Sequence, residues 1–238
     1  MFVASGNPVG VGARGSGPQR RLVVAGLVVA IGGAVLVRSA LRRRETSSPA
    51  GPQATVLSAT VVDDTHPVPE FRLSGTQGDV TRQTLEGQWT FVFFGYTYCP
   101  DVCPTTLGVM KKVRSGLNRD EQPRVLFVSV DPARDSLDLL KDYVSAFDPT
   151  FIAATGSDEA LAPLLKHFGA MFQRNNGSAD QGHYTVDHTA AIFLVDPQAR
   201  LKAVFSPPFM PQTMLADLRR LTRRDVSDRA TGPGRVGN

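Results

Sequence analysis

The fold of this 238-residue chain is decided by residues 91–104, which read FVFFGYTYCPDVCP. Residues 91–94 form a continuous apolar run, as expected for a strand that is covered on both faces of a sheet. The two cysteines of the chain, Cys99 and Cys103, follow at once, and each of them precedes a proline. Two thiols at loop spacing, at the end of a buried strand, indicate sulfur chemistry: a redox pair, a metal site or both.

The prolines predict the local geometry of the cysteine loop. A residue before proline is disfavoured in the α conformation, so neither Cys99 nor Cys103 is expected inside a helix. Pro104 suits the first position of the next helix, where its missing N–H would have no partner, and this places Cys103 at the N-cap. Both sulfurs would then lie near the positive end of the helix dipole, which predicts lowered thiol pKa values.

Three interpretations of the cysteine pair are open at this point. The pair is structural and inert, it cycles between dithiol and disulfide, or its two thiolates hold a soft metal such as Cu(I) or Zn(II). The redox interpretation departs from the thioredoxin pattern, because three residues and not two separate the cysteines. The metal interpretation requires a third ligand from elsewhere in the chain.

Histidine suits these metals as a third ligand, and the chain has four: His66, His167, His183 and His188. His66 adjoins a proline at the edge of the domain, and His167 ends a predicted helix, where a cation suits the dipole. His183 and His188 differ in parity along an extended segment, so only one of them can face the cysteine loop. His188 adjoins the apolar run 190–195, and the core therefore fixes its position. The alternative for His188 is a purely structural histidine at the start of a strand.

The rest of the chain alternates strands and helices, which is the pattern of an α/β fold. The expected elements are a hairpin of 71–73 and 79–81, strands at 89–94, 125–130 and 151–154, helices at 104–117, 136–146 and 158–168, a surface loop at 175–182, a hairpin of 189–195 and 201–205, and a closing helix at 211–224. Asp135 or Ser136 would cap the second of these helices, and Ser157 would cap the third. This order predicts a thioredoxin-like fold with additions. Redox members of such folds usually carry a cis-proline in the loop that faces the cysteines, whereas this chain has His188 there.

Charge and composition divide the chain into five parts. Residues 1–19 are expected to be disordered, 20–41 to form a transmembrane anchor with a cleaved signal peptide as the rival, 42–64 to form a flexible tether, 65–224 to form the thioredoxin-like domain and 225–238 to form a disordered tail. Residues 45–218 carry 13 basic and 20 acidic residues. This acidic balance argues against a nucleic-acid-binding domain, so no nucleic-acid partner is expected.

Three motifs give the chain a resemblance to the Sco/SenC family of copper chaperones. They are residues 94–104, residues 128–135 (VSVDPARD) and residues 186–189 (VDHT), and the resemblance covers roughly residues 65 to 222. It implies a thioredoxin-like, membrane-anchored protein that binds one copper ion, Cu(I) or Cu(II), through Cys99, Cys103 and His188. It also implies a partner, the copper-site subunit of cytochrome c oxidase, whose binuclear copper site the protein would help to assemble, with other copper carriers as further partners.

The resemblance also bears on location and on single residues. It implies a single-pass protein of the cell inner membrane whose soluble domain faces the periplasm, or one of the mitochondrial inner membrane that faces the intermembrane space. Tyr98 departs from the many members that carry histidine before the first cysteine, but that position is not a ligand. Asp131 and Asp135 match an acidic motif of the family, and we expect a turn residue and a helix cap there. The alternative to a non-enzymatic chaperone is a thiol–disulfide oxidoreductase whose Cys99 and Cys103 reduce the cysteines of a partner's copper site.

Overall fold

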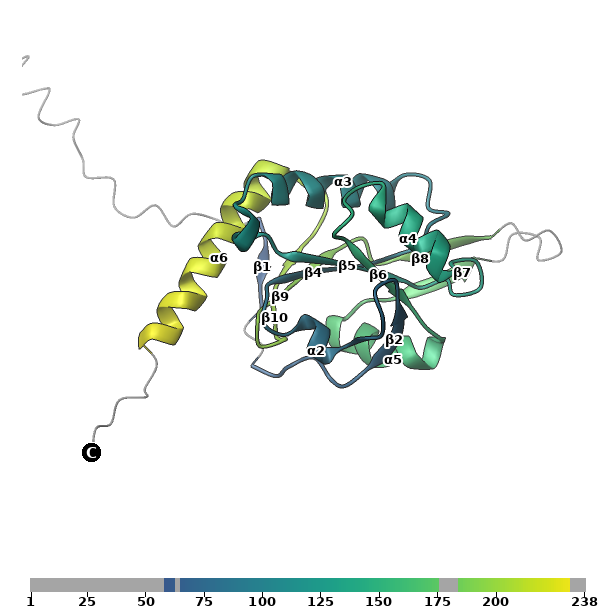
Figure 1. Ribbon diagram of the computed structural model, residues 1–238, viewed down its shortest axis with the longest axis horizontal. Coiled ribbons are helices and arrows are strands. Elements are labelled where there is room, and N and C mark those ends of the chain that lie inside the picture. The colour runs from purple at the N-terminus through teal and green to yellow at the C-terminus, as the bar shows by residue number, and fades with distance from the viewer. Residues whose placement is uncertain (1–57, 63–64, 176–183, 232–238) are drawn as a thin grey trace, which may run out of the picture. The chain divides into compact units, whose positions relative to one another are not determined.

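A mixed β-sheet runs through the domain, which the computed structural model describes at residues 58–62, 65–175 and 184–231 (Figure 1). In order across the sheet, its strands are β1 (Thr60–Val61), β10 (Leu201–Phe205), β9 (Ile192–Val195), β4 (Thr90–Gly95), β5 (Arg124–Ser129), β6 (Ile152–Thr155), β2 (Arg72–Gly75) and β3 (Val80–Thr81). The neighbours β4, β5 and β6 are parallel, and the other described pairs in this sheet are antiparallel. Parallel central strands joined through helices confirm the predicted α/β class.

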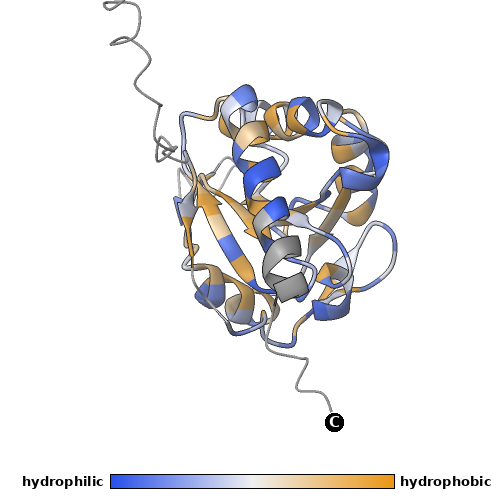
Figure 2. Cartoon of the chain, turned by 90° about the vertical axis from the view of Figure 1, so that its left-hand side faces the viewer, coloured by the Kyte–Doolittle hydropathy of each residue, from blue (hydrophilic) through white to orange (hydrophobic). Residues whose placement is uncertain are grey.

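Helices cover both faces of the sheet (Figure 1). They are α2 (Arg82–Leu85), α3 (Val102–Ser115), α4 (Leu137–Ser145), α5 (Asp158–Phe168) and α6 (Pro211–Thr231), with a short 3-10 helix at Arg119–Glu121. Phe91 and Phe93 of β4 pack in the core cluster shared with α3, α4 and α6, whereas Val92 and Phe94 pack in the cluster shared with α5. The helices carry both hydrophilic and hydrophobic residues along their length, as helices with one face on a sheet do (Figure 2).

Strand β4 lies at the centre of both core clusters, as the apolar run predicts. All six of its residues are buried, and residues 91–94 have no exposed surface. Burying one large apolar side chain stabilises a fold by about 1.5–3 kcal/mol. The cysteine loop therefore leaves the sheet from a strongly held strand.

The predicted helix caps at two serines are confirmed. The Ser136 hydroxyl accepts a hydrogen bond from the backbone N–H of Leu139 at the start of α4. The Ser157 hydroxyl accepts one from Ala160 at the start of α5. Ser136 and not Asp135 is therefore the N-cap of α4, so the Asp135 carboxylate does not cap this helix.

A two-stranded sheet, β7 (Phe172–Asn175) and β8 (Thr185–His188), lies outside the eight-stranded sheet and was not predicted. His188 ends β8 and is paired with Phe172, so the predicted strand at 189–195 begins only at Ile192. The predicted hairpin of β9 and β10 is confirmed. The predicted surface loop lies outside the described residues, apart from Asn175, which ends β7.

The structure moves both predicted boundaries of the domain. At its start, the backbone N–H groups of Ser58 and Ala59 donate to the buried Asp217 carboxylate of α6, and Thr60 pairs with Val204 of β10. The last residues of the predicted tether thus belong to the fold. At its end, α6 continues to Thr231, past residue 224, because a helix end without an apolar stripe leaves no periodic signal in the sequence. The predicted anchor at 20–41 lies outside the described residues, and no helix among those described is long and apolar enough to cross a membrane.

Candidate metal centre

The cysteine loop connects the end of β4 to the start of α3. Helix α3 begins at Val102, with Asp101 as its N-cap residue, so Cys103 lies in the first helical turn. The prediction that Cys103 would be the N-cap residue is therefore wrong by two positions. Pro104 is accommodated because the N–H groups of a first helical turn have no partner within the helix, and the helix can begin before the proline.

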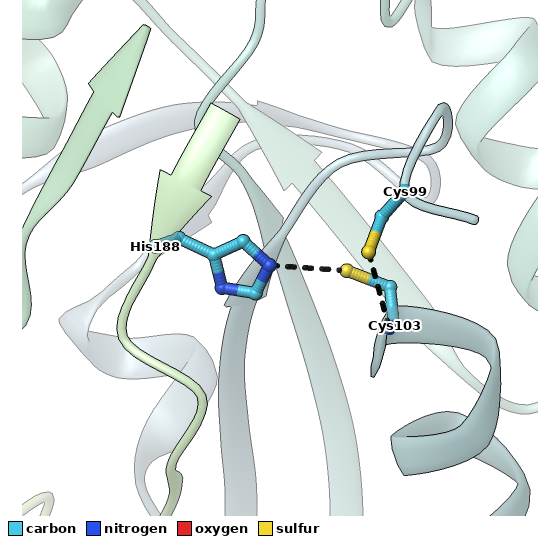
Figure 3. Close-up of side chains that lie close together, drawn as sticks. All are labelled: Cys99, Cys103 and His188. Carbon is cyan, nitrogen blue, oxygen red and sulfur yellow. Dashed lines mark hydrogen bonds between the residues drawn. The ribbon is translucent and has the colours of Figure 1, made fainter. Parts of the chain in front are cut away.

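Three side chains meet at this loop: Cys99, Cys103 and His188 (Figure 3). The Cys103 Sγ lies 3.4 Å from the His188 Nε2, and the backbone N–H of Cys103 donates to the Cys99 Sγ at 3.4 Å. The three potential ligand atoms lie within 4.8 Å of one another, and they form the one such group of three found among the described residues. Residues 85 positions apart in the sequence thus converge at one point.

The three side chains differ in their access to solvent. Cys103 is fully buried, whereas Cys99 and His188 are half-buried. A cleft of about 420 Å³ is lined by Tyr98 and Pro100, the residues on either side of Cys99. The Cys103 sulfur is therefore closed to solvent, whereas Cys99 and His188 are partly accessible, and the cleft adjoins the neighbours of Cys99 in the chain.

Glycine at position 95 is required for this packing. A Cβ atom there would lie 2.7 Å from the Cys103 Sγ and 2.7 Å from a ring carbon of Phe127. Real Cβ atoms essentially never come so close to another heavy atom. The glycine therefore allows the first helical turn to bring its sulfur down onto the end of β4.

The imidazole of His188 is held with one nitrogen toward the sulfurs. Its Nδ1 lies 3.3 Å from the carbonyl oxygen of Thr189, which favours the tautomer with hydrogen on Nδ1. Its ring packs edge-on against Phe93 and Tyr96, at centroid distances of 5.8 and 6.0 Å. Nε2 is then left with a lone pair that faces Cys103, which is the arrangement of a ligating histidine.

Burial governs the protonation of the group. Burial raises the pKa of the Cys103 thiol well above its usual range, and the neighbouring Cys99 raises it further. Burial lowers the pKa of His188. The predicted lowering of the thiol pKa by the helix dipole is therefore wrong for Cys103, because the loss of solvation outweighs the dipole.

The donor set fits a soft cation. Two sulfurs and one imidazole nitrogen are the ligands that Cu(I) and Zn(II) accept. The raised pKa of Cys103 and the lowered pKa of His188 keep both side chains neutral near pH 7 in the absence of a metal. A bound cation would favour the thiolate of Cys103, so binding would release its proton. His66 and His167, the other described histidines, lie outside the group of three, and His183 lies outside the described residues.

The two aspartates of the predicted acidic motif are buried and hold the loops around the site. Asp135 accepts hydrogen bonds from the backbone N–H of Thr97 at 3.0 Å and from the hydroxyls of Thr97 and Ser129 at 2.5 Å. Asp131 accepts from Arg134 Nε at 2.6 Å and from the Tyr184 hydroxyl. The predicted cap at Asp135 is wrong, because the carboxylate turns inward to the cysteine loop. Arg134 and Tyr184 were missed, since no local pattern marks a contact across 50 positions.

Comparison with known proteins identifies the family. The sequence pattern of the SCO1/SenC family matches residues 61–223. A SCO2-like protein of Rickettsia conorii is 30% identical over 152 residues, which make up 63% of this chain and 74% of that protein. The SCO2 homologue of Bos taurus mitochondria is 32% identical over 200 residues, or 81% of this chain and 71% of its own.

Solved structures agree with this assignment and with the predicted thioredoxin-like fold. The apo Sco1 protein of Thermus thermophilus has a TM-score of 0.64 at 36% sequence identity, and the match covers 71% of this chain and 99% of that one. The ScoI protein of Bradyrhizobium japonicum, solved with copper bound, has a TM-score of 0.59 at 35% identity, over 66% and 99% of the two chains. The chain therefore belongs to the SCO1/SenC family.

Proposed function

We propose that this protein is a metallochaperone that binds one copper ion per chain through Cys99, Cys103 and His188. The observation that carries the proposal is the convergence of two sulfurs and one imidazole nitrogen within 4.8 Å. The set suits Cu(I) and, with a further oxygen donor, Cu(II). The copper bound to the related ScoI of Bradyrhizobium japonicum supports the choice of copper over zinc.

Transfer of copper would proceed by ligand exchange and without turnover of a substrate. Cys103 would hold the ion from the buried side, whereas Cys99 and His188 are both partly exposed, and the residues on either side of Cys99 line the cleft. A thiolate of a partner protein could therefore replace Cys99 first and draw the ion outward. Each exchange keeps the copper bound to sulfur, so the free ion is never released to water.

The family resemblance supports a specific recipient and place. The recipient is the copper-site subunit of cytochrome c oxidase, which would receive the ion at its binuclear site, and other copper carriers would supply it. The segment 20–41 would anchor the chain in the cell inner membrane with the domain in the periplasm, or in the mitochondrial inner membrane with the domain in the intermembrane space.

A second function, thiol–disulfide exchange, is favoured by the position of Cys99. Its sulfur is half-buried and accepts the N–H of Cys103 at the start of α3, and the attacking group in thiol–disulfide exchange is a cysteine thiolate. Such a thiolate could attack the disulfide of a partner's copper site, and Cys103 would then resolve the mixed disulfide, leaving the partner reduced and this chain oxidised. The oxidised pair could no longer hold copper, so redox state and copper loading would be coupled.

The experiment that separates the two functions combines a copper titration with a redox titration of the full chain in detergent. The chaperone predicts one tight copper ion per reduced chain, an affinity at least about tenfold weaker in His188→Ala, and no change in the matched control His66→Ala. Weak or absent copper binding, together with a reduction potential that lets the chain reduce a partner disulfide, would instead favour the reductase.

A further inference from the structure

The candidate metal centre joins two parts of the fold that are not in the same sheet. Cys99 and Cys103 follow β4 of the eight-stranded sheet, whereas His188 ends β8 of the separate two-stranded sheet. The ladder between β7 and β8 fixes the hairpin internally, but it does not fix the distance from His188 to the sulfurs. Contacts between the two parts must do this, among them the packing of the His188 ring on Phe93 and Tyr96, because a ligand displaced by half an ångström weakens a metal site.

Arg134 makes one such contact on the side of β8, in addition to the contact of Arg174 in β7 with the carbonyl oxygen of Val130 at 2.8 Å. Its Nη1 donates to the carbonyl oxygen of Tyr184 at 2.9 Å, and its guanidinium carbon lies 3.6 Å from the centre of the Tyr184 ring. The Tyr184 hydroxyl donates to Asp131, which is itself paired with Arg134 Nε at 2.6 Å. Tyr184 is thus held by its carbonyl, its ring and its hydroxyl, and it directly precedes the strand that carries His188.

The same guanidinium also reaches the cysteine loop. Its carbon lies 4.9 Å from the ring centre of Tyr98, the residue before Cys99, and 5.6 Å from that of Tyr96. The chain has four tyrosines, and three of them face this one cation. Arg134 is mostly buried, with 16% of its side chain exposed, and its partner Asp131 is fully buried. A cation is attracted by the negative faces of aromatic rings, and the attraction is stronger where the cation is shielded from water.

We propose that Arg134 is a positioning residue that clamps the cysteine loop to the start of β8 and so sets the distance between His188 and the two sulfurs. Its role at the metal rests on the proposed function, whereas the clamp itself belongs to the metal-free fold. Arginine is required because its planar fork pairs with Asp131, donates to the Tyr184 carbonyl and stacks on the rings together. Lysine can keep the charge beside Asp131, but its single nitrogen cannot make the other contacts in the same geometry.

The chain contains a matched control for a substitution at Arg134. Arg200 donates from Nε to the fully buried Asp196 at 2.8 Å, in a second Asp-Pro turn. That turn lies at the other end of the sheet, because Val195 pairs with Thr90 at the start of β4. Arg200→Lys therefore removes a guanidinium that pairs with a buried aspartate, as Arg134→Lys does, but at a distance from the metal centre.

The test compares Arg134→Lys, Arg200→Lys and Tyr184→Leu in the full chain in detergent. Tyr184→Leu leaves the buried ion pair of Arg134 with Asp131 in place, so it keeps the test open if Arg134→Lys folds poorly. In the reduced, metal-free protein, amide hydrogen exchange at 185–188 and in the cysteine loop should accelerate at least about tenfold in Arg134→Lys and Tyr184→Leu, but not in Arg200→Lys. With Cu(I) added, affinity should fall at least about tenfold in the first two, with a weakened imidazole signal in X-ray absorption.

The outcomes distinguish the clamp from the proposed function. Unchanged exchange in Arg134→Lys and Tyr184→Leu would overturn the clamp, whatever the copper result. Accelerated exchange with unchanged copper affinity and an intact imidazole signal would overturn the positioning role. A wild-type chain that takes up no copper would overturn the proposed function, and the exchange comparison would still decide whether Arg134 holds the two segments together.

Discussion

Replacing Gly95 by alanine should damage the metal centre through a single added methyl group. The Cβ atom would lie 2.7 Å from the Cys103 Sγ and 2.7 Å from a ring carbon of Phe127, where ordinary contact begins at 3.4 Å. Phe127 has no exposed surface, and neither has Cys103. Both neighbours are thus held by the core, and at least one of them must move by about 0.7 Å, the difference between the contact distances.

This displacement determines how much stability and copper affinity the Gly95→Ala protein should lose. Overpacking a well-filled core costs about 1–3 kcal/mol of unfolding free energy. A metal site tolerates misplacement of its ligands by only about 0.5 Å, so copper affinity should fall at least about tenfold. The stability and copper losses should appear together, because the same sulfur lies in the core and in the metal centre.

Gly108 supplies the control for this experiment. It lies in α3, the helix that carries Cys103, and a Cβ atom there would meet no atom within 4 Å. Gly108→Ala should therefore leave copper binding unchanged and stabilise the helix by up to about 1 kcal/mol. Urea unfolding and a Cu(I) titration against a competing chelator measure both quantities. A Gly95→Ala protein with wild-type copper affinity, or a Gly108→Ala protein that loses as much, would refute the reasoning.

Three further predictions concern charge, protonation and oxidation at the same site. Because burial raises the pKa of Cys103, the folded, reduced chain keeps a proton that the unfolded chain loses above its cysteine pKa of about 8.5. The metal-free chain should therefore lose stability as the pH rises above about 9, by up to about 1.4 kcal/mol per pH unit. In Cys103→Ala, the free energy of unfolding measured with urea should fall less steeply with pH. Asp135→Asn replaces one of the two oxygens that accept from Thr97 and Ser129 with an amide donor and should cost about 1–3 kcal/mol in urea unfolding. The exposed Asp138→Asn is the control, and an equal loss there would contradict the role of Asp135. Mild oxidation should form a disulfide between Cys99 and Cys103, with loss of two protons and two electrons to the oxidant, and should release copper; free thiols that persist under oxidant in mass spectrometry would count against it.

The parts of the fold that local sequence patterns control were predicted well. The apolar run of β4 and the serine caps of α4 and α5 each depend on a few consecutive residues, and the structure has all of them. The β7–β8 hairpin was missed because its strands have four residues each and only Val186 is fully buried among them. Such strands carry little of the apolar alternation that marks a strand in a sequence.

The candidate site also has features that local sequence patterns predicted and features that they did not. The spacing of the cysteines, the parity of the histidines and the expected order of elements favoured His188 beside Cys99 and Cys103, and the full set of three was what the family resemblance implied. The clamp at Arg134 could not be predicted, because its contacts with Tyr98 and Tyr184 cross 36 and 50 positions and depend on two loops folding against each other. The raised pKa of Cys103 was missed for a related reason, since the depth of burial depends on packing from several elements at once.

X-ray absorption at the copper edge of the reduced, Cu(I)-loaded full chain tests the central claim most directly. We expect two sulfur ligands and one nitrogen ligand, with the multiple scattering of an imidazole that disappears in His188→Ala. A spectrum with sulfur ligands alone, together with the same copper affinity in wild type and His188→Ala, would contradict it.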